Sequence, residues 1–233
     1  MNDQQQDSGN AVRARAIAKT YVLGKHRIPV LQDISLDVSF GETVCIRGAS
    51  GAGKTTLLHI LGGLEQPNSG TVEIGGADVY MMGEGRRSHL RGTRVGFVFQ
   101  AYHLLPELTV EENVMLPSMR LSGAGRARVE AEKRCRELLD HVGLSDRLDH
   151  RPPELSGGEQ QRAAIARSLI NDPDIMLADE PTGNLDSRTG DSVLDLLFDL
   201  VDARHRTLVM VTHNDQVAER CTRSMILADG VIR

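Results

Sequence analysis

One glycine-rich stretch has the residue types and spacing needed to hold a chain of phosphates. Gly48-Ala49-Ser50-Gly51-Ala52-Gly53-Lys54-Thr55 fits the pattern GxxxxGK[ST]. In this pattern the glycines let backbone N–H groups turn toward phosphate, the lysine reaches the outer phosphates and the hydroxyl ligates Mg2+. The sequence therefore predicts a site for a nucleoside triphosphate, with Lys54 on the β- and γ-phosphates and Thr55 on the metal.

The residues on either side of this loop give it the context that the pattern requires. Residues 43–47 form a short apolar run typical of a strand, and residues 56–61 open a helix. A helix N-terminus adds partial positive charge where the phosphates would lie. The strand, loop and helix together favour nucleotide binding over a chance match.

Two further apolar runs end in residues that could act on a phosphate. Residues 175–178 are followed by Asp179 and Glu180, and residues 207–212 are followed by His213. We expect Asp179 near the metal and Glu180 one residue beyond it, placed to polarise an attacking water. Because open α/β sheets bind ligands at the carboxyl ends of their strands, His213 is expected to contact the γ-phosphate.

Two other features carry chemistry only in combination with the phosphate loop. Gln100 ends a short apolar run, and its amide can contact both water and phosphate. Ser156, Gly157 and Gly158 place a hydroxyl and unhindered N–H groups at the start of a helix, which predicts a second anion site. Since one nucleotide does not need two such sites from one chain, the second is expected to serve a nucleotide held by another copy.

Composition narrows the class of protein. The chain has 233 residues and a formal net charge of −5, which argues against a broad basic face for nucleic acid. Cys45, Cys135 and Cys221 lack metal-ligand spacing and are typical of reduced, partly buried thiols in a cytosolic protein. No apolar stretch approaches the length of about 20 residues that a membrane span needs, so we expect any membrane part to come from another chain.

The pattern of apolar and polar residues in the rest of the chain predicts an α/β fold. We expect a disordered polar tail at residues 1–10, after which alternating residues indicate strands, including a hairpin at residues 71–79. Helical periodicity follows at residues 110–121, 126–142 and 187–203, and the chain ends in strands at 224–227 and 231–232. The second of these helices is expected to present one apolar face made of Val129, Cys135, Leu138, Leu139 and Val142.

Taken in order, these motifs resemble those of an ABC-transporter ATPase subunit over nearly the whole chain after the tail. The resemblance implies a P-loop NTPase cassette over residues 11–233, with a mixed RecA-like core sheet, an antiparallel β subdomain and an α-helical subdomain at about residues 101–160. It implies ATP and Mg2+ as cofactors, with Thr55, Gln100 and Asp179 around the metal. Glu180, His213 and Gln100 would be the catalytic residues.

The same resemblance assigns the residues that contact the nucleotide. Tyr21 looks like the aromatic residue that stacks on adenine, Ser156 to Gln160 like the signature sequence and residues 183–186 like the D-loop. The implied nucleotide contacts are Tyr21, Gly48, Ala49, Ser50, Gly51, Ala52, Gly53, Lys54, Thr55, Thr56, Ser156, Gly157, Gly158, Glu159 and Asp186.

Members of this family act as head-to-tail dimers around two ATPs and drive integral membrane permease subunits. The resemblance therefore implies two partners here, a second copy of the chain and a membrane permease, and no nucleic acid. It also implies a location at the cytoplasmic face of the inner membrane. Residues 57–64, 102–106 and 150–154 are similar to the ATPases of lipoprotein-releasing systems and to their relatives in efflux and cell division. Either the apolar residues after Gln100 contact the membrane partner or they pack the helical insertion. These residues are Leu104, Leu105, Pro106 and Leu108.

Three other classes of ATP-binding protein do not account for the features of this sequence. An ABC ATPase that acts on DNA needs a long coiled coil between Gln100 and Ser156, and this interval holds only short helices. A translation-type ABC protein carries two cassettes in one chain. A P-loop kinase does not need the signature sequence or His213. A scaffold role, as in cell-division relatives, shares the whole motif set and stays open.

Overall fold

The computed structural model describes residues 9–122 and 125–233. The chain forms two compact units, of which unit 1 comprises Met1–Arg87 and Thr207–Arg233 and unit 2 comprises Ser88–Arg206. Most of the predicted tail lies outside the described residues, and the first strand begins at Asn10. No helix in the described ranges is long and apolar enough to span a bilayer.

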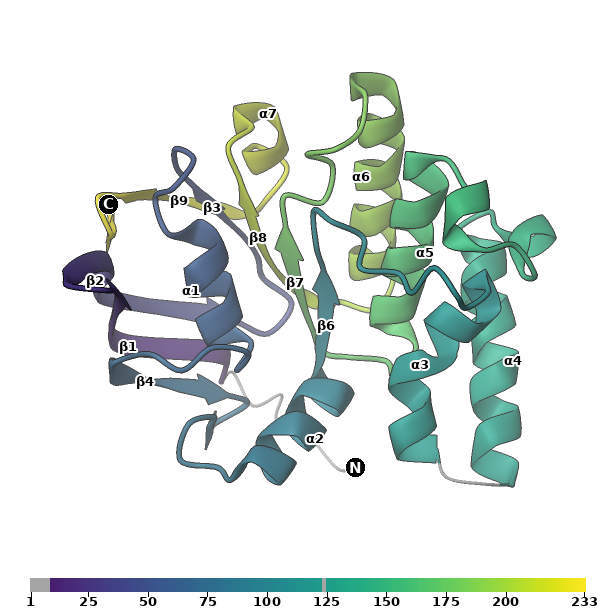
Figure 1. Cartoon of the computed structure of the whole chain (residues 1–233), viewed down its shortest axis with the longest axis horizontal. Coiled ribbons are helices and arrows are strands. Elements are labelled where there is room, and N and C mark those ends of the chain that lie inside the picture. The colour runs from purple at the N-terminus through teal and green to yellow at the C-terminus, as the bar shows by residue number, and fades with distance from the viewer. Residues whose placement is uncertain (1–8, 123–124) are drawn as a thin grey trace, which may run out of the picture. The chain divides into compact units, whose positions relative to one another are not determined.

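Unit 1 contains an antiparallel sheet with the strand order β2-β1-β4-β5 (Figure 1). The alternating pattern in β1 and β2 buries one face, where Ile17 and Ile34 pair across the strands and are almost inaccessible to solvent. The predicted hairpin at residues 71–79 is confirmed, because β4 and β5 pair across a turn. The strands are β1 (Asn10–Leu23), β2 (His26–Ser39), β4 (Ser69–Ile74) and β5 (Ala77–Asp78).

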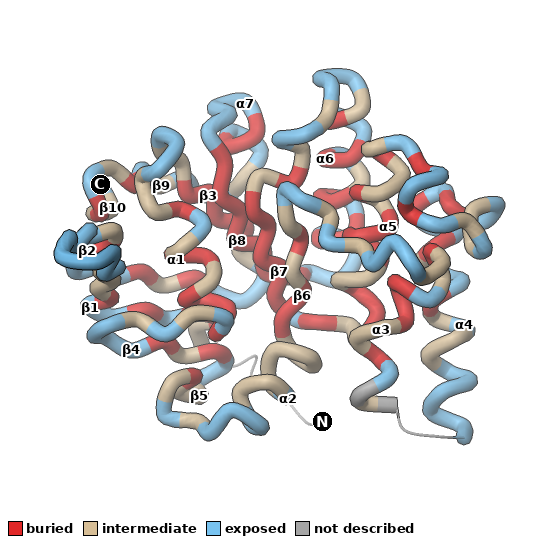
Figure 2. Tube along the Cα trace, in the orientation of Figure 1, coloured by how far each residue is buried: buried red, intermediate tan, exposed pale blue. Residues whose placement is uncertain are grey.

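A second set of strands in unit 1 is mostly parallel, in the order β10-β9-β3-β8. The predicted buried strand at residues 207–212 is confirmed as β8, which is buried along its whole length, and β3 is buried except at Arg47 (Figure 2). Helix α1 packs near β8. The elements are β3 (Thr43–Arg47), β8 (Thr207–Thr212), β9 (Arg223–Ala228), β10 (Val231–Ile232), α1 (Lys54–Leu61) and α7 (Asp215–Ala218).

Unit 2 contains the parallel pair β6 (Val95–Val98) and β7 (Ile175–Asp179). Every residue of β7 is buried, as its continuous apolar run predicts. Helices α5 (Gly157–Leu169) and α6 (Ser187–Asp202) lie side by side (Figure 1). The predicted helix at residues 187–203 is confirmed as α6, and one face of it is buried through Val193, Leu194, Leu197, Leu200 and Val201.

The helical insertion in unit 2 is built on α3 (Val110–Ser122) and α4 (Arg126–His141), which pack against each other and against α5. The expected face of α4 is correct at Cys135 and Leu139 but wrong at Val129, which is 64% exposed. At 3.6 residues per turn Val129 lies about 120° around the helix from Cys135, so it cannot share the buried line. The remaining helical segments of the chain are α2 (Glu84–Arg94), η1 (Ser145–Arg147) and η2 (Pro152–Glu154).

Candidate functional site

The glycine-rich loop joins β3 to α1, and close approach to its neighbours dictates two of its glycines. Gly53 caps α1 with φ of +99°, and a Cβ there would lie 2.9 Å from Cγ1 of Val30. A Cβ at Gly48 would lie 2.3 Å from the backbone oxygen of Leu227. The loop therefore packs closely against β2 and β9, and neither position has room for a side chain.

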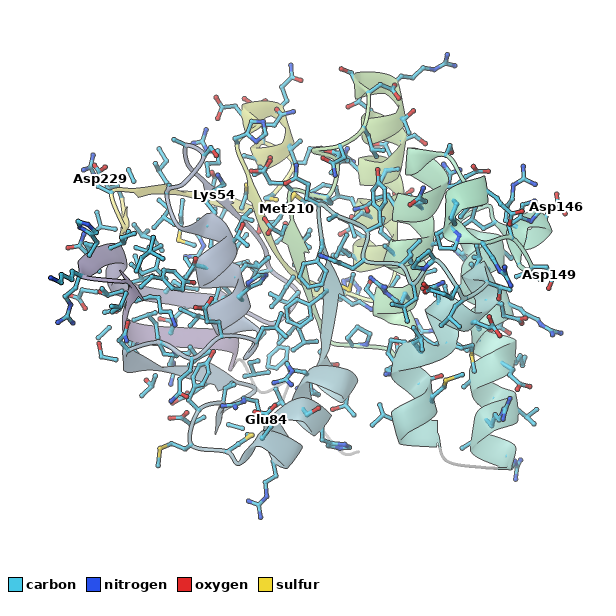
Figure 3. All side chains as sticks on the ribbon, in the orientation of Figure 1. Lys54, Glu84, Asp146, Asp149, Met210 and Asp229 are labelled. Atoms are coloured by element: carbon cyan, nitrogen blue, oxygen red, sulfur yellow. The ribbon has the colours of Figure 1, made fainter. Side chains whose placement is uncertain are left out.

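Lys54 is the first residue of α1 and is only 6% exposed (Figure 3). Its Nζ donates to the backbone oxygens of Gly48, at 2.8 Å, and Ala49, at 3.0 Å. The ammonium group therefore lies across the loop whose amides would hold phosphate. This places a fixed positive charge next to the N-terminus of an eight-residue helix, where an anion is stabilised.

A groove of about 380 Å³ in unit 1 runs along the first half of the loop. Its walls come from the loop, from β2 and from the turn between β9 and β10. The lining residues are Ile28, Pro29, Val30, Gly48, Ala49, Ser50, Gly51, Ala52, Ile226, Leu227, Ala228, Asp229 and Gly230.

Tyr21 lies on β1 in the same unit, and its hydroxyl is 3.4 Å from Oγ1 of Thr56. The Lys19 ammonium lies 5.1 Å from the ring centroid and also pairs with Glu65, at 2.8 Å. Burial and a hydrogen bond to Glu65 raise the pKa of the Tyr21 hydroxyl. The ring is thus a neutral, oriented aromatic surface beside the helix that begins with Lys54.

His213 follows β8 and lies at the same sheet edge as the phosphate loop. Strands β3 and β8 are parallel with Arg47 opposite Thr212, so Gly48 and His213 leave the sheet side by side. The segment after His213 is also tied to β3, because Arg47 Nη1 pairs with Asp215 at 2.7 Å. The three sequence-predicted parts of unit 1, namely Tyr21, the loop and His213, therefore belong to one compact unit.

The predicted acids and amide of unit 2 lie at the carboxyl ends of β6 and β7. Val98 pairs with Ala178, so Gln100 and Glu180 each lie two residues beyond this pair, at the same edge of the sheet. Asp179 is the last residue of β7 and is 8% exposed. Glu180 has φ of +41°, which is uncommon for a residue with a Cβ and turns the chain sharply after the strand.

The signature sequence begins α5 with a reciprocal cap. Ser156 is the N-cap residue: its N–H and its hydroxyl both donate to Oε2 of Glu159, at 2.8 and 2.7 Å, while its Oγ accepts from the Glu159 N–H at 3.3 Å. The hydrogen bond from the Ser156 hydroxyl, together with nearby Arg147, lowers the pKa of Glu159. The N-terminus of α5 therefore carries an ionised carboxylate, and Gly157 and Gly158 form its first turn.

Asp186 caps α6 and completes the predicted set in unit 2. Its carboxylate accepts a hydrogen bond from the Thr189 N–H at 3.1 Å, and this contact lowers the pKa of Asp186. Unit 2 thus holds Gln100, the signature sequence, Asp179, Glu180 and Asp186.

Two amides that the sequence interpretation passed over fix the loops around these residues. Gln161 is fully buried and donates from Nε2 to the backbone oxygens of Pro181, at 2.6 Å, and Phe99, at 3.4 Å. Asn113 is also fully buried, and its amide contacts the backbone of Leu105, Leu108 and Thr109. The only sequence signal for either residue is a polar side chain inside an apolar helix pattern.

Each unit carries donor groups of the kinds that a nucleotide and a hard divalent cation require. Backbone amides and an ammonium suit phosphate, and hydroxyl, carboxylate and amide oxygens, as at Thr55, Asp179 and Gln100, are the ligands that Mg2+ prefers. A carboxylate at Glu180 can accept a proton from water.

Comparisons with known proteins agree with this chemistry. The family model described as ABC transporter matches residues 31–183. A protein named lipoprotein-releasing system ATP-binding protein LolD from Xanthomonas oryzae pv. oryzae is 49% identical over 222 residues, covering 95% of this chain and 90% of the relative. A protein of the same name from Geobacter metallireducens is 51% identical over 214 residues, covering 92% and 94%.

A solved structure shows the same fold. The dimeric ATP-binding cassette MJ0796, in a post-hydrolysis state bound to ADP and Pi, superposes with a TM-score of 0.88 at 39% identity, covering 95% of this chain and 96% of that one. The predicted cassette architecture, with its antiparallel sheet, mostly parallel strands and helices, is confirmed. The chain belongs to the ABC transporter family, as one of its ATP-binding cassettes.

Proposed function

We propose that this chain is the ATP-hydrolysing subunit of a lipoprotein-releasing transporter. The observation that supports it is the similarity to proteins named LolD, which extends over 95% of the chain at 49% identity. ATP hydrolysis by ABC cassettes drives a membrane partner, so the chain would act peripherally at the cytoplasmic face of the inner membrane.

Within unit 1 the chain's own residues hold the nucleotide. Amides of residues 48–55 and the Lys54 ammonium bind the phosphates, and the Tyr21 ring supports the adenine. Lys54 already lies across the loop through its contacts to Gly48 and Ala49, so little reorganisation is needed for it to turn toward an anion. His213 leaves the sheet beside Gly48, where it can contact the γ-phosphate.

Within unit 2 Glu180 is the proposed general base, and it accepts a proton from the attacking water. The proposed ligands of Mg2+ are Gln100 and Asp179 of this unit and Thr55 of unit 1, and the ion supplies charge neutralisation on the phosphates when bound. Asp179 is 8% exposed at the carboxyl end of β7, so its carboxylate is shielded from bulk water, which strengthens its attraction to a cation.

The second copy of the chain would supply the remaining contacts. Two similar solved structures are dimers of the cassette MJ0796. A head-to-tail dimer would present Ser156, the N–H groups of Gly157 and Gly158, and Asp186 of one chain to the nucleotide held by the other. In each chain Ser156 is held by Glu159, so the hydroxyl exchanges a carboxylate for a phosphate when the dimer closes.

The loop after Gln100 is the proposed contact with the membrane subunit. Leu105 is 46% exposed, Pro106 is exposed, and Leu104 and Leu108 are half-buried, so none of the four belongs to the core. Buried Asn113 fixes the backbone of this loop through both Leu105 groups and Leu108. A rigid loop with exposed apolar side chains favours docking of a partner over packing of the insertion.

Two related outputs differ from lipoprotein release. A MacB-like ATPase drives efflux, and an FtsE-like ATPase acts in cell division without transport. Purified chain reconstituted with the candidate membrane subunits and a lipoprotein-loaded membrane distinguishes them: release of lipoprotein that depends on ATP is the expected result. ATPase activity that the partner leaves unchanged, with no release, would overturn the proposal.

We predict that Glu180→Gln lowers kcat by about 10²-fold or more, because it removes the general base, and that it traps an ATP-bound dimer. The amide keeps the shape of the side chain, so the affinity of the chain for ATP is expected to be retained. Size measurement by light scattering, with ATP and Mg2+, checks the dimer. A variant that stays monomeric at saturating ATP contradicts the sandwich arrangement.

A further inference from the structure

Two loops of unit 2 leave the ends of β6 and β7 and are held to each other. The first carries Gln100, and the second carries Glu180 and then Gly183 and Asn184. Strand register places their starting points side by side, with Val98 opposite Ala178. Buried Gln161 donates to one backbone oxygen in each loop, that of Phe99 in the first and that of Pro181 in the second. A single side-chain amide therefore holds both backbones.

The side chain of Asn184 makes a two-point contact with Gln100. Asn184 Nδ2 donates to the backbone oxygen of Gln100 at 2.9 Å, and Gln100 Nε2 donates to Asn184 Oδ1 at 3.2 Å. A backbone oxygen can only accept, so Asn184 must turn its NH2 group toward it. Its Oδ1 then faces Gln100, which must in turn present its own NH2 group. The carbonyl oxygen of the Gln100 amide is thereby directed away from Asn184.

The residue before Asn184 leaves room for this contact. A Cβ at Gly183 would lie 2.7 Å from Nε2 of Gln100, so any larger residue would displace the amide. A backbone hydrogen bond of 2.9 Å from Gly183 N to Glu180 O closes the turn. The pairing therefore depends on both residues of the dipeptide, and it joins Gln100 to the loop that begins with Glu180.

We propose that Asn184 is a positioning residue for the metal site. It orients the Gln100 amide so that the oxygen, a hard ligand, and not the nitrogen is available to Mg2+. This inference rests on the proposed role of Gln100 as a metal ligand. It adds a residue that touches neither metal nor nucleotide within its own subunit and acts only through Gln100.

The test compares variants that keep the size of Asn184 but lose its hydrogen bonds. Asn184→Leu removes both, and Asn184→Asp keeps the acceptor but cannot donate to the Gln100 backbone oxygen. Mn2+ is used in place of Mg2+ because it is paramagnetic. Electron paramagnetic resonance measures the affinity of Mn2+ for the chain loaded with a non-hydrolysable ATP analogue. We expect Mn2+ binding to weaken by about tenfold in both variants, as is usual when a residue that orients a metal ligand is lost.

A matched control is Asn171→Leu, which removes the 2.8 Å hydrogen bond from Asn171 Nδ2 to Gly92 O elsewhere in unit 2. This control should leave Mn2+ affinity unchanged even where its thermal midpoint falls. Affinity for the analogue in EDTA should be the same in all variants, because the nucleotide contacts in unit 1 are intact.

A double-mutant cycle decides whether Asn184 acts through Gln100. Gln100→Ala is expected to weaken Mn2+ binding, and adding Asn184→Leu to it should cause no further loss. If Gln100→Ala weakens binding while Asn184→Leu does not, or if the two losses add, the positioning role is wrong. If Gln100→Ala itself has no effect, the proposed metal role of Gln100 is wrong and the inference falls with it.

Discussion

At the scale of single residues, the phosphate loop is shaped by what its glycines must avoid. Gly48 lies under the backbone oxygen of Leu227, and the backbone of a strand cannot move aside as a side chain can. The space requirement is therefore stricter at Gly48 than at a glycine whose neighbours are flexible. The pattern GxxxxGK[ST] records this requirement without giving its cause.

We predict that Gly48→Ala lowers the free energy of unfolding by about 1–3 kcal/mol, as overpacking does, and weakens ATP binding. The matched control is Gly85→Ala, because Gly85 is exposed in α2 and a Cβ there would meet nothing within 4 Å. The control should raise stability by up to about 1 kcal/mol through helix propensity. Chemical denaturation measures both, and a Gly48→Ala protein as stable as the wild type would contradict the packing argument.

The carboxylate of Glu159 lies at a helix end that is proposed to face phosphate, so its negative charge opposes that of the ligand. Glu159→Gln keeps the cap with Ser156, since glutamine also fits a capping box, and removes one negative charge. We predict that it lowers the ATP concentration for half-maximal dimerisation by a factor on the order of three, as expected for one screened charge. Light scattering in the Glu180→Gln background measures this, with Glu130→Gln as the control.

At this scale the sequence identified chemistry better than contacts. Each predicted site residue follows from a motif or from the family resemblance, but spacing does not indicate that Asn184 faces Gln100. Nor did it show that Cys45 and Cys221 lie close enough to interact, which raises the pKa of Cys45 and lowers that of Cys221. Such pairs depend on which strands are neighbours, and strand order is a property of the folded sheet.

At the scale of elements, one carboxylate joins several segments of unit 2. Asp172, in the connection between α5 and β7, pairs with Arg134 of α4 at 2.8 Å and with Arg204 and Arg206 before β8 at 3.0 and 2.6 Å. Burial by itself raises the pKa of Asp172, but the hydrogen bonds from Arg134 and Arg206 outweigh it, so the net shift is downward. The helical insertion is thereby tied to the end of α6.

We predict that Asp172→Asn destabilises the protein by about 1–2 kcal/mol at pH 7, after allowing for solvent screening of this half-exposed group. Asparagine also accepts the positive φ of this position, so the backbone is preserved. Because the folded pKa is lowered, the contribution is complete above the unfolded pKa of about 3.9 and is lost as the pH falls through the folded pKa. Denaturation from pH 7 to pH 3 should show the two proteins converging only below about pH 4.

Element types were largely predictable, and faces were less so. Apolar runs such as residues 207–212 can form only buried strands at that length, and the period of α6 identifies its buried side. Val129 is exposed although it is apolar, because six residues separate it from Cys135 and place it about 120° around the helix. Neither Asn113 nor Asp172 has a pattern, because each is defined by backbone and side chains far away in the sequence.

At the scale of the whole molecule, the proposed dimer places each active site between two chains. Lys54→Ala disables the phosphate loop, and Ser156→Arg disables the signature end of α5. We predict that neither variant hydrolyses ATP alone and that a mixture regains activity. The reason is that a mixed dimer pairs the intact loop of one chain with the intact signature of the other.

Phosphate release after mixing measures this complementation, and ATP binding to the Ser156→Arg chain should be nearly normal. A control mixture of Lys54→Ala with the double variant should stay inactive. Loss of ATP binding in Ser156→Arg alone would place Ser156 in the site of its own chain and contradict the head-to-tail arrangement.

The left-handed backbone at Glu180 has a consequence for how this sequence can change. A residue with a Cβ loses roughly 1–2 kcal/mol in that conformation, whereas glycine does not. Selection for heat resistance alone would therefore favour Glu180→Gly, and selection for ATP turnover would oppose it. In a mutant library screened only for survival on heating, this codon is among the first where stability should be gained and activity lost.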